Sequence, residues 1–508
     1  MKKIFLSRIT AVSICFFMLL TSLIACVKPD SGNTGDSTTA ATDSTAQTPE
    51  TSSNTDENGF LLDDLSPDLN FGNSTVRFLV WSDVENNEFE IAEQSDNAVD
   101  NAIYLRNKTF ERRLGVTFEF EAIPGNYGNQ RNFISTAQTR ISAGSPSAPH
   151  IMAAYSLTSA GLVANGLTYK LNELENLDFS KPWWPDSLVN TATIGGKLYF
   201  TSGDISTNML YMMYATFFNK DIFIEQHPDM TVSDMYKLVT DGRWTIDKMI
   251  ELCDGVYRDE NANGVVDYED LYGFETIDLH FDAFYIGSDL KLLDKDETGA
   301  LVMSPDFTSE KTHALLEKIT NFFYDSGFAF TKGTTSKYSS AQSFKSARVL
   351  YTVDRVYIAS GTLKDVDFKY GILPVPKYDE EQSEYRTCMA FPFTLYSVSV
   401  KAKDADAAVL ECLGSESYRR ITPALFEQSM KVRYSESPDD SAMYDLVKKS
   451  VAMDLARIFT TPLNNNSYAP FRNAVKNDTA AGWSRSTTQL KNVINVYIKN
   501  INSAMSGQ

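Results

Sequence analysis

The stretch that decides the fold reads VRFLVW (76–81) at its start and NAIYLRNKTFERRLGVTFEF (101–120) at its end. The first six residues are apolar apart from one arginine, which is typical of a buried strand. Apolar residues then recur at helical spacing, and Gly115 predicts the end of that helix. Beyond it, apolar and polar residues alternate up to Phe120, as in a strand with one buried face. A strand, a helix and a strand in succession predict a βαβ unit, and therefore a parallel sheet.

The alternation of helices and strands continues along the chain. Periodic apolar residues predict helices over 133–141, 315–323 and 405–413, and a short strand over 151–154. Thr245 is placed to cap a further helix that begins at the next residue. The folded part spans roughly 440 residues, which is too long for one hydrophobic core. The sequence therefore predicts an α/β protein with more than one lobe.

Residues 1–25 have the pattern of a secretory signal. Basic residues precede an apolar run over 9–25. The run leads into LIAC (23–26), which resembles the processing motif of bacterial lipoprotein precursors, in which the cysteine receives lipid and the chain is cut just before it. We therefore expect Cys26 to be the lipidated N-terminus of the mature protein. The alternatives are a plain signal peptide or a membrane span, although a span needs about 20 apolar residues.

Residues 26–70 are rich in Ser, Thr, Gly, Asp and Asn and hold few large apolar residues. Such a segment cannot bury enough surface to offset the entropy of ordering, so it predicts a flexible tether. Two acyl chains, at about 0.8 kcal/mol per buried methylene, hold a protein on a membrane essentially permanently. The predicted location is extracytoplasmic, on the outer face of the cell membrane, with lipid as the anchor.

Composition narrows the class of protein further. The formal net charge of −20 argues against nucleic acid as a partner, because phosphate binding needs clustered Lys and Arg. Apart from the two cysteines of the N-terminal segment, the chain has Cys253, Cys388 and Cys412. Their spacing fits no metal site, so we expect them to be buried apolar residues.

Short segments that follow one another in a set order carry a resemblance over nearly the whole mature chain. They are DNAIYLRN (100–107), KPWW (181–184) with GKLY (196–199), FNKDIF (218–223), GRWTID (242–247), DLYGF (270–274) and YGILPVPKYD (370–379). In these segments the chain resembles the extracellular solute-binding proteins of ABC importers, in particular the large sugar-binding family (family 1) that includes the maltose-binding protein. No single segment is decisive, and the weight lies in their order and spacing.

The resemblance implies a periplasmic-binding-protein-like fold. In that family two α/β lobes are joined by hinge segments that cross between them, and the ligand lies in the cleft. Carried over, the first crossing falls near 208–216 and the second near 387–394. The implied boundaries are 71–207 plus 392–420 for lobe one, and 210–390 plus 421–508 for lobe two.

The resemblance also implies a function. The protein is expected to capture a carbohydrate, either a mono- or an oligosaccharide, and to deliver it as a monomer to a membrane permease driven by an ATPase. We expect no catalysis and no catalytic cofactor, because the sequence has no metal-binding histidine motif, nucleophile elbow or phosphate loop. One alternative is a surface glycoside hydrolase or lyase, since a pair of carboxylates is enough for that chemistry. Another is a binding protein for a non-sugar solute such as a peptide.

A sugar site needs aromatic rings for the sugar faces and polar side chains for the hydroxyls. Ligands of open α/β sheets lie beyond the carboxyl ends of the strands. In lobe one, Trp81 and Asp83 follow the first strand, and Tyr155 follows the next predicted strand end. Asp204 comes just before the first expected crossing. We predict that these four side chains contact the ligand.

Lobe two offers two further groups of candidates. His280 and Phe281 come soon after the DLYGF segment, where the resembled family often has an aromatic and polar wall. Arg355 and Tyr357 follow the apolar strand 349–353, in the region where the family supplies a stacking aromatic. Here the arginine precedes the tyrosine, so which of the two stacks on the ligand is open. The two tryptophans of KPWW stand between prolines and are interpreted as structural.

A separate signal is the twelve-residue segment DENANGVVDYED (259–270). It matches the calcium loop at its first, third, fifth, sixth, ninth and twelfth positions, with a glycine at the sharp turn. It departs from the loop in ending on aspartate rather than glutamate. The alternative is a solvated turn. The predicted calcium ligands of this structural site are Asp259, Asn261, Asn263, the carbonyl of Val265, Asp267 and Asp270.

Overall fold

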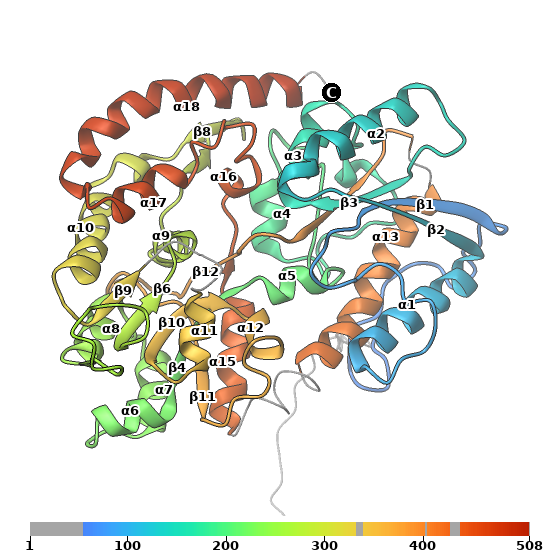
Figure 1. Cartoon of the computed structure of the whole chain (residues 1–508). Coiled ribbons are helices and arrows are strands. Elements are labelled where there is room, and N and C mark those ends of the chain that lie inside the picture. Colours follow the sequence, from blue (N-terminus) through green and yellow to red (C-terminus); the bar gives the residue numbers. More distant parts are fainter. Residues whose placement is uncertain (1–53, 332–338, 402–403, 427–436, 507–508) are drawn as a thin grey trace, which may run out of the picture. The chain divides into compact units, whose positions relative to one another are not determined.

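The βαβ unit predicted from residues 76–120 is present in the computed structural model (Figure 1). Strand β1 (Ser74–Trp81) pairs in parallel with β2 (Val116–Ile123), and helix α1 (Ala98–Leu114) connects them. Gly115 ends α1 in the left-handed conformation, with φ of 59°, which a residue without a Cβ adopts easily. The period of apolar residues therefore predicted both the elements and their pairing.

The structure describes residues 54–331, 339–401, 404–426 and 437–506. The predicted signal sequence, the lipidated Cys26 and the tether up to residue 53 lie outside the described residues. Residues 54–70, which were predicted to belong to the flexible tether, instead pack on the folded part: Asp63 is buried and pairs with Arg113 at 2.7 Å. In the part of the chain that is described, no helix is long and apolar enough to span a membrane.

The first of two main sheets has the strand order β13-β3-β1-β2. Strand β3 (Ile151–Tyr155) lies parallel to β1, whereas β13 (Thr394–Val398) is antiparallel to β3. All three helices predicted by periodicity are present, and two of them accompany this sheet: α2 (Gln130–Ser142), and α13 (Asp404–Glu416), which packs against α1. Every strand of this sheet comes from the ranges predicted for lobe one.

The second main sheet has six strands, in the order β11-β4-β10-β6-β5 with β9 also paired to β6. Strand β10 lies parallel to β6 and antiparallel to β4, so β6 and β10 end at the same edge of the sheet. All of its strands come from residues 210–390. They are β4 (Tyr214–Asn219), β5 (Tyr257–Arg258), β6 (Leu271–Thr276), β9 (Ala329–Thr331), β10 (Val349–Arg355) and β11 (Tyr370–Leu373).

Helices cover these sheets, and two short strand pairs complete the fold. Thr245 accepts a hydrogen bond from the Lys248 amide and so caps α8, as predicted. The remaining helices are α3 (Ser156–Ala164), α4 (Asp186–Ala192), α5 (Thr207–Tyr211), α6 (Lys220–Gln226), α7 (Val232–Thr240), α8 (Ile246–Cys253), α9 (Phe281–Gly287), α10 (Glu310–Tyr324), α11 (Ser340–Lys345), α12 (Tyr357–Ser360), α15 (Pro438–Lys449), α16 (Leu455–Ile458), α17 (Ala469–Lys476) and α18 (Trp483–Ser506). The short pairs are β7 (Leu293–Lys295) with β8 (Leu301–Met303), and β12 (Thr387–Cys388) with β14 (Val451–Ala452).

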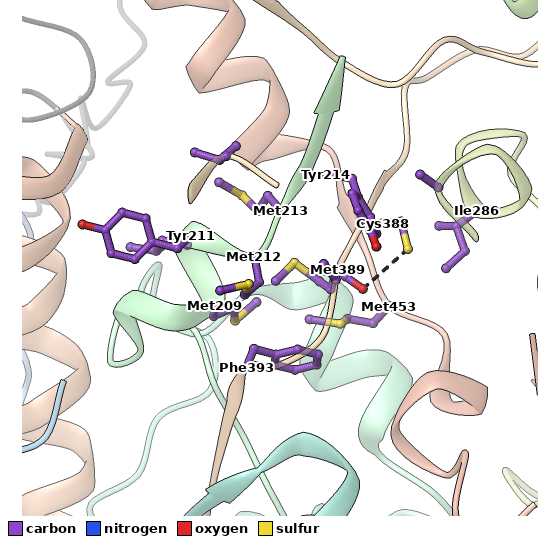
Figure 2. Close-up of a cluster of buried hydrophobic side chains, with 14 of the residues drawn as sticks. Met209, Tyr211, Met212, Met213, Tyr214, Ile286, Cys388, Met389, Phe393 and Met453 are labelled. Atoms are coloured by element: carbon purple, nitrogen blue, oxygen red, sulfur yellow. Dashed lines mark hydrogen bonds between the residues drawn. The ribbon is translucent and has the colours of Figure 1, made fainter. Parts of the chain in front are cut away.

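The segments that lead into β4 and into β13 cross between the sheets, and they run side by side. Met213 and Met389 form an antiparallel bridge, and the Ala390 amide donates to the carbonyl of Met212 at 2.7 Å. The first crossing therefore leads from the first sheet into β4, and the second leads back into β13. Figure 2 shows the methionines gathered where the two segments meet. Both crossings fall where they were predicted, and methionine suits such a place because its flexible thioether adapts to changes in packing.

The C-terminal part contacts both sheet regions. Helix α15 packs against β11, where Lys220 forms a buried ion pair with Asp440 at 2.8 Å. Helix α17 packs against α9 and α10, whereas α16 packs against α3, on the side of the first sheet. The assignment of residues 421–508 to lobe two stays a prediction, because these helices bridge the two regions.

The three cysteines of the folded part and the two tryptophans of KPWW are buried in the core. Cys253, Cys388 and Cys412 are free thiols, as predicted. Trp183 and Trp184 have at most 1% of their surface exposed, and the Trp184 Nε1 donates to Glu411 at 3.1 Å. Their interpretation as structural residues is confirmed.

Candidate binding site

Two cavities lie on opposite faces of the first crossing segment. Met213 and Tyr214 are neighbours in an extended chain, so their side chains point to opposite sides, as Figure 2 shows. Met213 lines a cavity of about 710 Å³, here called the hinge cavity, to which the segments 182–187, 203–213, 383–386 and 445–451 contribute. Tyr214 lines a cavity of about 310 Å³, here called the strand-end cavity.

The strand-end cavity is built at the carboxyl ends of β6 and β10. Its polar walls include His280, Asp354, Arg355, Arg457 and Arg472, and its aromatic walls are Tyr214, Tyr357 and Phe391. Ligands of open α/β sheets bind beyond the carboxyl ends of strands, so this is the candidate ligand site although the hinge cavity is larger. Of the residues predicted to contact the ligand, His280, Arg355 and Tyr357 line this cavity, and their contact with a ligand stays a prediction.

His280 is buried and neutral. Burial lowers its pKa, because a charged imidazole loses its hydration there. Its Nδ1 lies 2.7 Å from the carbonyl oxygen of Val353, and a carbonyl can only accept, so Nδ1 carries the proton. The Nε2 atom is then left as an acceptor, which suits a ligand hydroxyl.

Arg355 links the second sheet to a loop of the first. Its Nη1 lies 3.0 and 3.2 Å from the two carboxylate oxygens of Glu85, which follows β1. Its guanidinium also lies 5.7 Å from the centre of the Tyr357 ring, within cation–π distance. The Tyr357 ring meets Tyr211 edge-on at 5.7 Å and remains half-buried. Tyr357 thus lines the cavity as the aromatic wall, whereas Arg355 is held by Glu85.

Sequence reasoning missed two arginines of the cavity, Arg457 and Arg472. Both donate from Nη1 to the same oxygen, Oδ2 of Asp282, and the distance from Arg472 is 3.0 Å. The guanidinium of Arg457 also lies 4.2 Å from the centre of the Phe391 ring. Nothing local in the sequence marks this group, because Asp282 lies more than 170 residues before either arginine.

Four predicted ligand residues line neither cavity. Trp81 is fully buried, donates from Nε1 to Thr394 at 2.9 Å and stacks on Tyr155. Tyr155 in turn meets Phe391 edge-on at 6.1 Å, and so lies behind the cavity wall. Trp81 ends a strand in the interior of its sheet, which is why it packs in the core.

The other two of these residues have structural contacts as well. The carboxylate of Asp83 accepts from the backbone amides of Gly125 at 2.8 Å and Asn126 at 3.0 Å, and so fixes that loop. Phe281 is fully buried against Phe323. Ligand contact by Trp81, Tyr155, Asp83 and Phe281 stays a prediction that this arrangement does not support.

Asp204 lines the hinge cavity instead of the strand-end cavity. Its Oδ1 accepts from Lys448 at 2.9 Å and from the hydroxyl of Thr422. The carboxylate is buried and already paired, so it joins the first crossing to α15. The structure therefore separates Asp204 from His280, Arg355 and Tyr357, which it brings together.

The predicted calcium loop folds as a turn around its own amides. The amide of Gly264 donates to Asp259 at 2.9 Å, and that of Asn263 donates to Asn261 at 3.1 Å. Gly264 takes a φ of 68°, as the sixth position of such a loop requires. Asn263 accepts in the same way from Val265, at 2.6 Å.

The end of the loop offers one unused oxygen. Asp270 is fully buried; its Oδ2 accepts from the Tyr257 hydroxyl and the Asp267 amide, both at 3.1 Å, whereas Oδ1 has no hydrogen-bond partner. Across the described residues, no three His, Cys, Asp or Glu side chains are grouped as a metal site. The loop therefore has oxygen donors that fit calcium, but the three carboxylates among its predicted ligands, Asp259, Asp267 and Asp270, are not gathered.

Comparison with known proteins identifies structures that have a similar fold. No protein-family model matches the sequence, and no curated protein matches it. Among solved structures, the chain is similar to the cyclic alpha-maltosyl-1,6-maltose binding protein of Arthrobacter globiformis, with TM-score 0.52 and 12% identity over 86% of this chain and 100% of that one. It is also similar to the sugar-binding protein MalE of Xanthomonas citri, with TM-score 0.52 and 11% identity over 85% and 98%.

A third similar structure is an ABC substrate-binding protein of Listeria monocytogenes in complex with cycloalternan. It gives a TM-score of 0.50 and 13% identity over 85% of this chain and 99% of that one. At these identities the likeness establishes the fold. The chain has the fold of ABC importer substrate-binding proteins, and the predicted α/β class with crossing hinge segments is confirmed.

Proposed function

We propose that this protein is the extracytoplasmic substrate-binding component of an ABC importer, and that it captures a carbohydrate in the strand-end cavity. The observation that carries the proposal is the composition of that cavity: three aromatic rings next to an imidazole acceptor, a carboxylate and guanidinium donors at the strand ends. Its volume of about 310 Å³ is at the small end of ligand sites, which suits one or two sugar rings. The similar structures named as sugar-binding proteins support the same conclusion.

The proposed mechanism is capture, closure and delivery. The two crossing segments serve as the hinge, and the ligand favours the closed form because only there does it touch both sides. Glu85 and Arg355, which come from opposite sides, are in contact in the present arrangement. The closed protein then meets a membrane permease whose transport step is driven by an ATPase. Lipid on Cys26 would keep the protein at the membrane surface.

The binding proposal is tested by calorimetry with a panel of neutral and acidic sugars and with peptides. The variant Tyr357→Ala should bind the preferred sugar at least tenfold more weakly, a loss of about 1.4 kcal/mol, because the ring that packs against the C–H face of the sugar is removed. The matched control is Tyr169→Ala, which removes an exposed tyrosine that lines neither cavity. Binding of peptides alone would contradict the proposal, and recovery of shortened sugars would favour the hydrolase.

The anchor is tested separately, by fractionation of cells that express the natural chain or Cys26→Ser. We expect the natural chain in the membrane fraction and extractable by detergent, because the acyl chains hold it there. Loss of the thiol should prevent lipidation. An unchanged distribution of natural chain and variant between fractions would contradict a lipid anchor.

We further propose that the loop over 259–270 binds calcium and thereby stabilises the second sheet region. The unpaired Oδ1 of the buried Asp270 favours this, because a buried carboxylate oxygen without a partner is costly. Calcium at about 100 times its dissociation constant would add about 2.7 kcal/mol to the free energy of unfolding. A chelator should lower the melting temperature of the natural chain but not that of Asp259→Asn. Equal melting temperatures with and without chelator would contradict the proposal.

A further inference from the structure

The strand-end cavity holds two arginines that share one carboxylate. Asp282 of α9 is fully buried, and its Oδ2 accepts from Arg457 of α16 and Arg472 of α17. Two guanidiniums against one carboxylate leave one positive charge. This charge lies in a cavity wall of a protein whose formal net charge is −20, so it is not a property of the surface in general.

The neighbouring charged groups are paired with partners other than Arg457 and Arg472 or lie beside Arg355. Asp354 and Glu85 both lie next to the third arginine of the cavity, Arg355. Asp454 accepts from the amides of Leu292 and Ala456, at 2.6 and 2.8 Å. Asp278 pairs with Lys476 at 2.7 Å, and the imidazole of the cavity is neutral because burial lowers its pKa. Arg355, Arg457 and Arg472 together are matched by Glu85, Asp354 and Asp282, so the positive charge is local to the side of the cavity that Arg457 and Arg472 form.

The two guanidiniums also have hydrogen-bonding capacity that the protein does not use. The Nε of Arg457 is buried and has no hydrogen-bond partner. The side chain of Arg472 is 20% exposed, and its described bond uses Nη1 out of five N–H groups. Buried donors are nearly always paired, so an unpaired guanidinium N–H in a cavity wall indicates a missing acceptor.

We infer that the ligand of the strand-end cavity is an acidic sugar, with a carboxylate on the ring or at its end, as in a uronic acid. This inference rests on the proposed function and deepens it. The planar fork of a guanidinium matches the two coplanar oxygens of a carboxylate, and such pairs are among the stronger hydrogen bonds. Tyr357 and Phe391 supply the rings against which the sugar packs.

The experiment compares glucuronate- and galacturonate-containing sugars with their neutral counterparts and with sulfated sugars, on the full mature chain by calorimetry. We expect uronates to bind at least tenfold more tightly than neutral sugars. Their affinity should fall as salt rises from about 0.05 to 0.5 M, because the Debye length shortens from near 14 to near 4 Å. Neutral sugars should show little salt dependence.

The variant Arg472→Gln should lose at least tenfold more affinity for uronates than for their neutral counterparts. Its control is Arg485→Gln, on the exposed face of α18, which should change neither. Melting curves with and without ligand show whether each variant is folded. If Arg472→Gln does not fold, the sugar panel and the salt series on the natural chain test the preference for uronates without the variant.

The outcomes separate this inference from the proposed function. Neutral sugars that bind as tightly as uronates would overturn the inference while the sugar-binding function stands. Sulfated sugars that bind more tightly than uronates would overturn the carboxylate in favour of a sulfate ester. Binding of no sugar at all would overturn the proposed function, and the inference with it.

Discussion

The hinge cavity and the strand-end cavity lie back to back across the first crossing segment, and they differ in how their charges are paired. The hinge cavity has more than twice the volume of the other. Its buried Asp204 is already bound by Lys448 and Thr422. The strand-end cavity is smaller, yet Arg457 and Arg472 in its wall retain unused hydrogen-bond donors. The cavity with unpaired hydrogen-bond donors is therefore the better candidate for the ligand site, although its volume is smaller.

The largest effect is expected from Arg457→Met. The guanidinium of Arg457 is buried on Asp282, and removal of one partner of a buried charge pair costs about 3–5 kcal/mol. Urea unfolding measures the loss in the free energy of unfolding. Unchanged stability would mean that Arg472 alone is a sufficient partner for Asp282. The guanidinium of Arg457 would then not be needed for folding.

The equivalent change in the hinge cavity is Lys448→Met, and we expect a smaller loss of about 1–2 kcal/mol. The side chain of Lys448 is 34% exposed, so water replaces part of its interaction with Asp204. Sugar affinity should stay within threefold of the natural chain in calorimetry. A tenfold loss of affinity would show that the hinge cavity takes part in binding, and it would break the comparison.

A pH series sharpens the description of the strand-end cavity through His280. Because burial lowers its folded-state pKa below the ordinary value of about 6.5, the unfolded chain binds a proton in this range that the folded chain does not. Stability from this group is thus present above about pH 6.5 and lost as the pH falls, by at most about 1.4 kcal/mol per pH unit.

Urea unfolding at pH 7.5 and 5.5 measures this loss, and His280→Gln should remove it. The control is His313→Gln, at a partly exposed histidine on α10. If the natural chain and His280→Gln lose the same free energy of unfolding on acidification, His280 is not the buried neutral group described here.

The smallest effect is expected from Glu85→Gln. Its ion pair with Arg355 is partly exposed on both sides, at 26% and 35%, so it contributes about 0–1 kcal/mol. Because the pair joins the two sides of the hinge, its loss should weaken sugar binding by at most about fivefold. Uronate preference should persist, since Arg355 is not the arginine that carries it. Loss of that preference in Glu85→Gln would shift the acidic subsite to Arg355.

The sequence predicted most features that depend on residues close together in the chain, such as strands, helices and their ends. The parallel pairing of β1 with β2 followed from apolar periods and from Gly115. His280, Arg355 and Tyr357 were predicted through the resemblance to the sugar-binding family, and the structure places them where β6 and β10 end, as the strand-end rule for open α/β sheets expects. The choice of Trp81 rested on the same rule, but its strand lies inside the first sheet and turns the indole into the core.

The charge pairing within the site depends on tertiary contacts. Periodicity along the chain predicted the strands and helices, because it is a property of neighbouring residues, whereas the crossings and the three cavity residues were predicted through the resemblance to the sugar-binding family. The pairing of Asp282 with Arg457 and Arg472 joins α9 to α16 and α17. Asp204 forms its ion pair with Lys448 on α15. Which charges remain unpaired depends on contacts between distant segments, and such contacts are set by packing rather than by spacing along the chain.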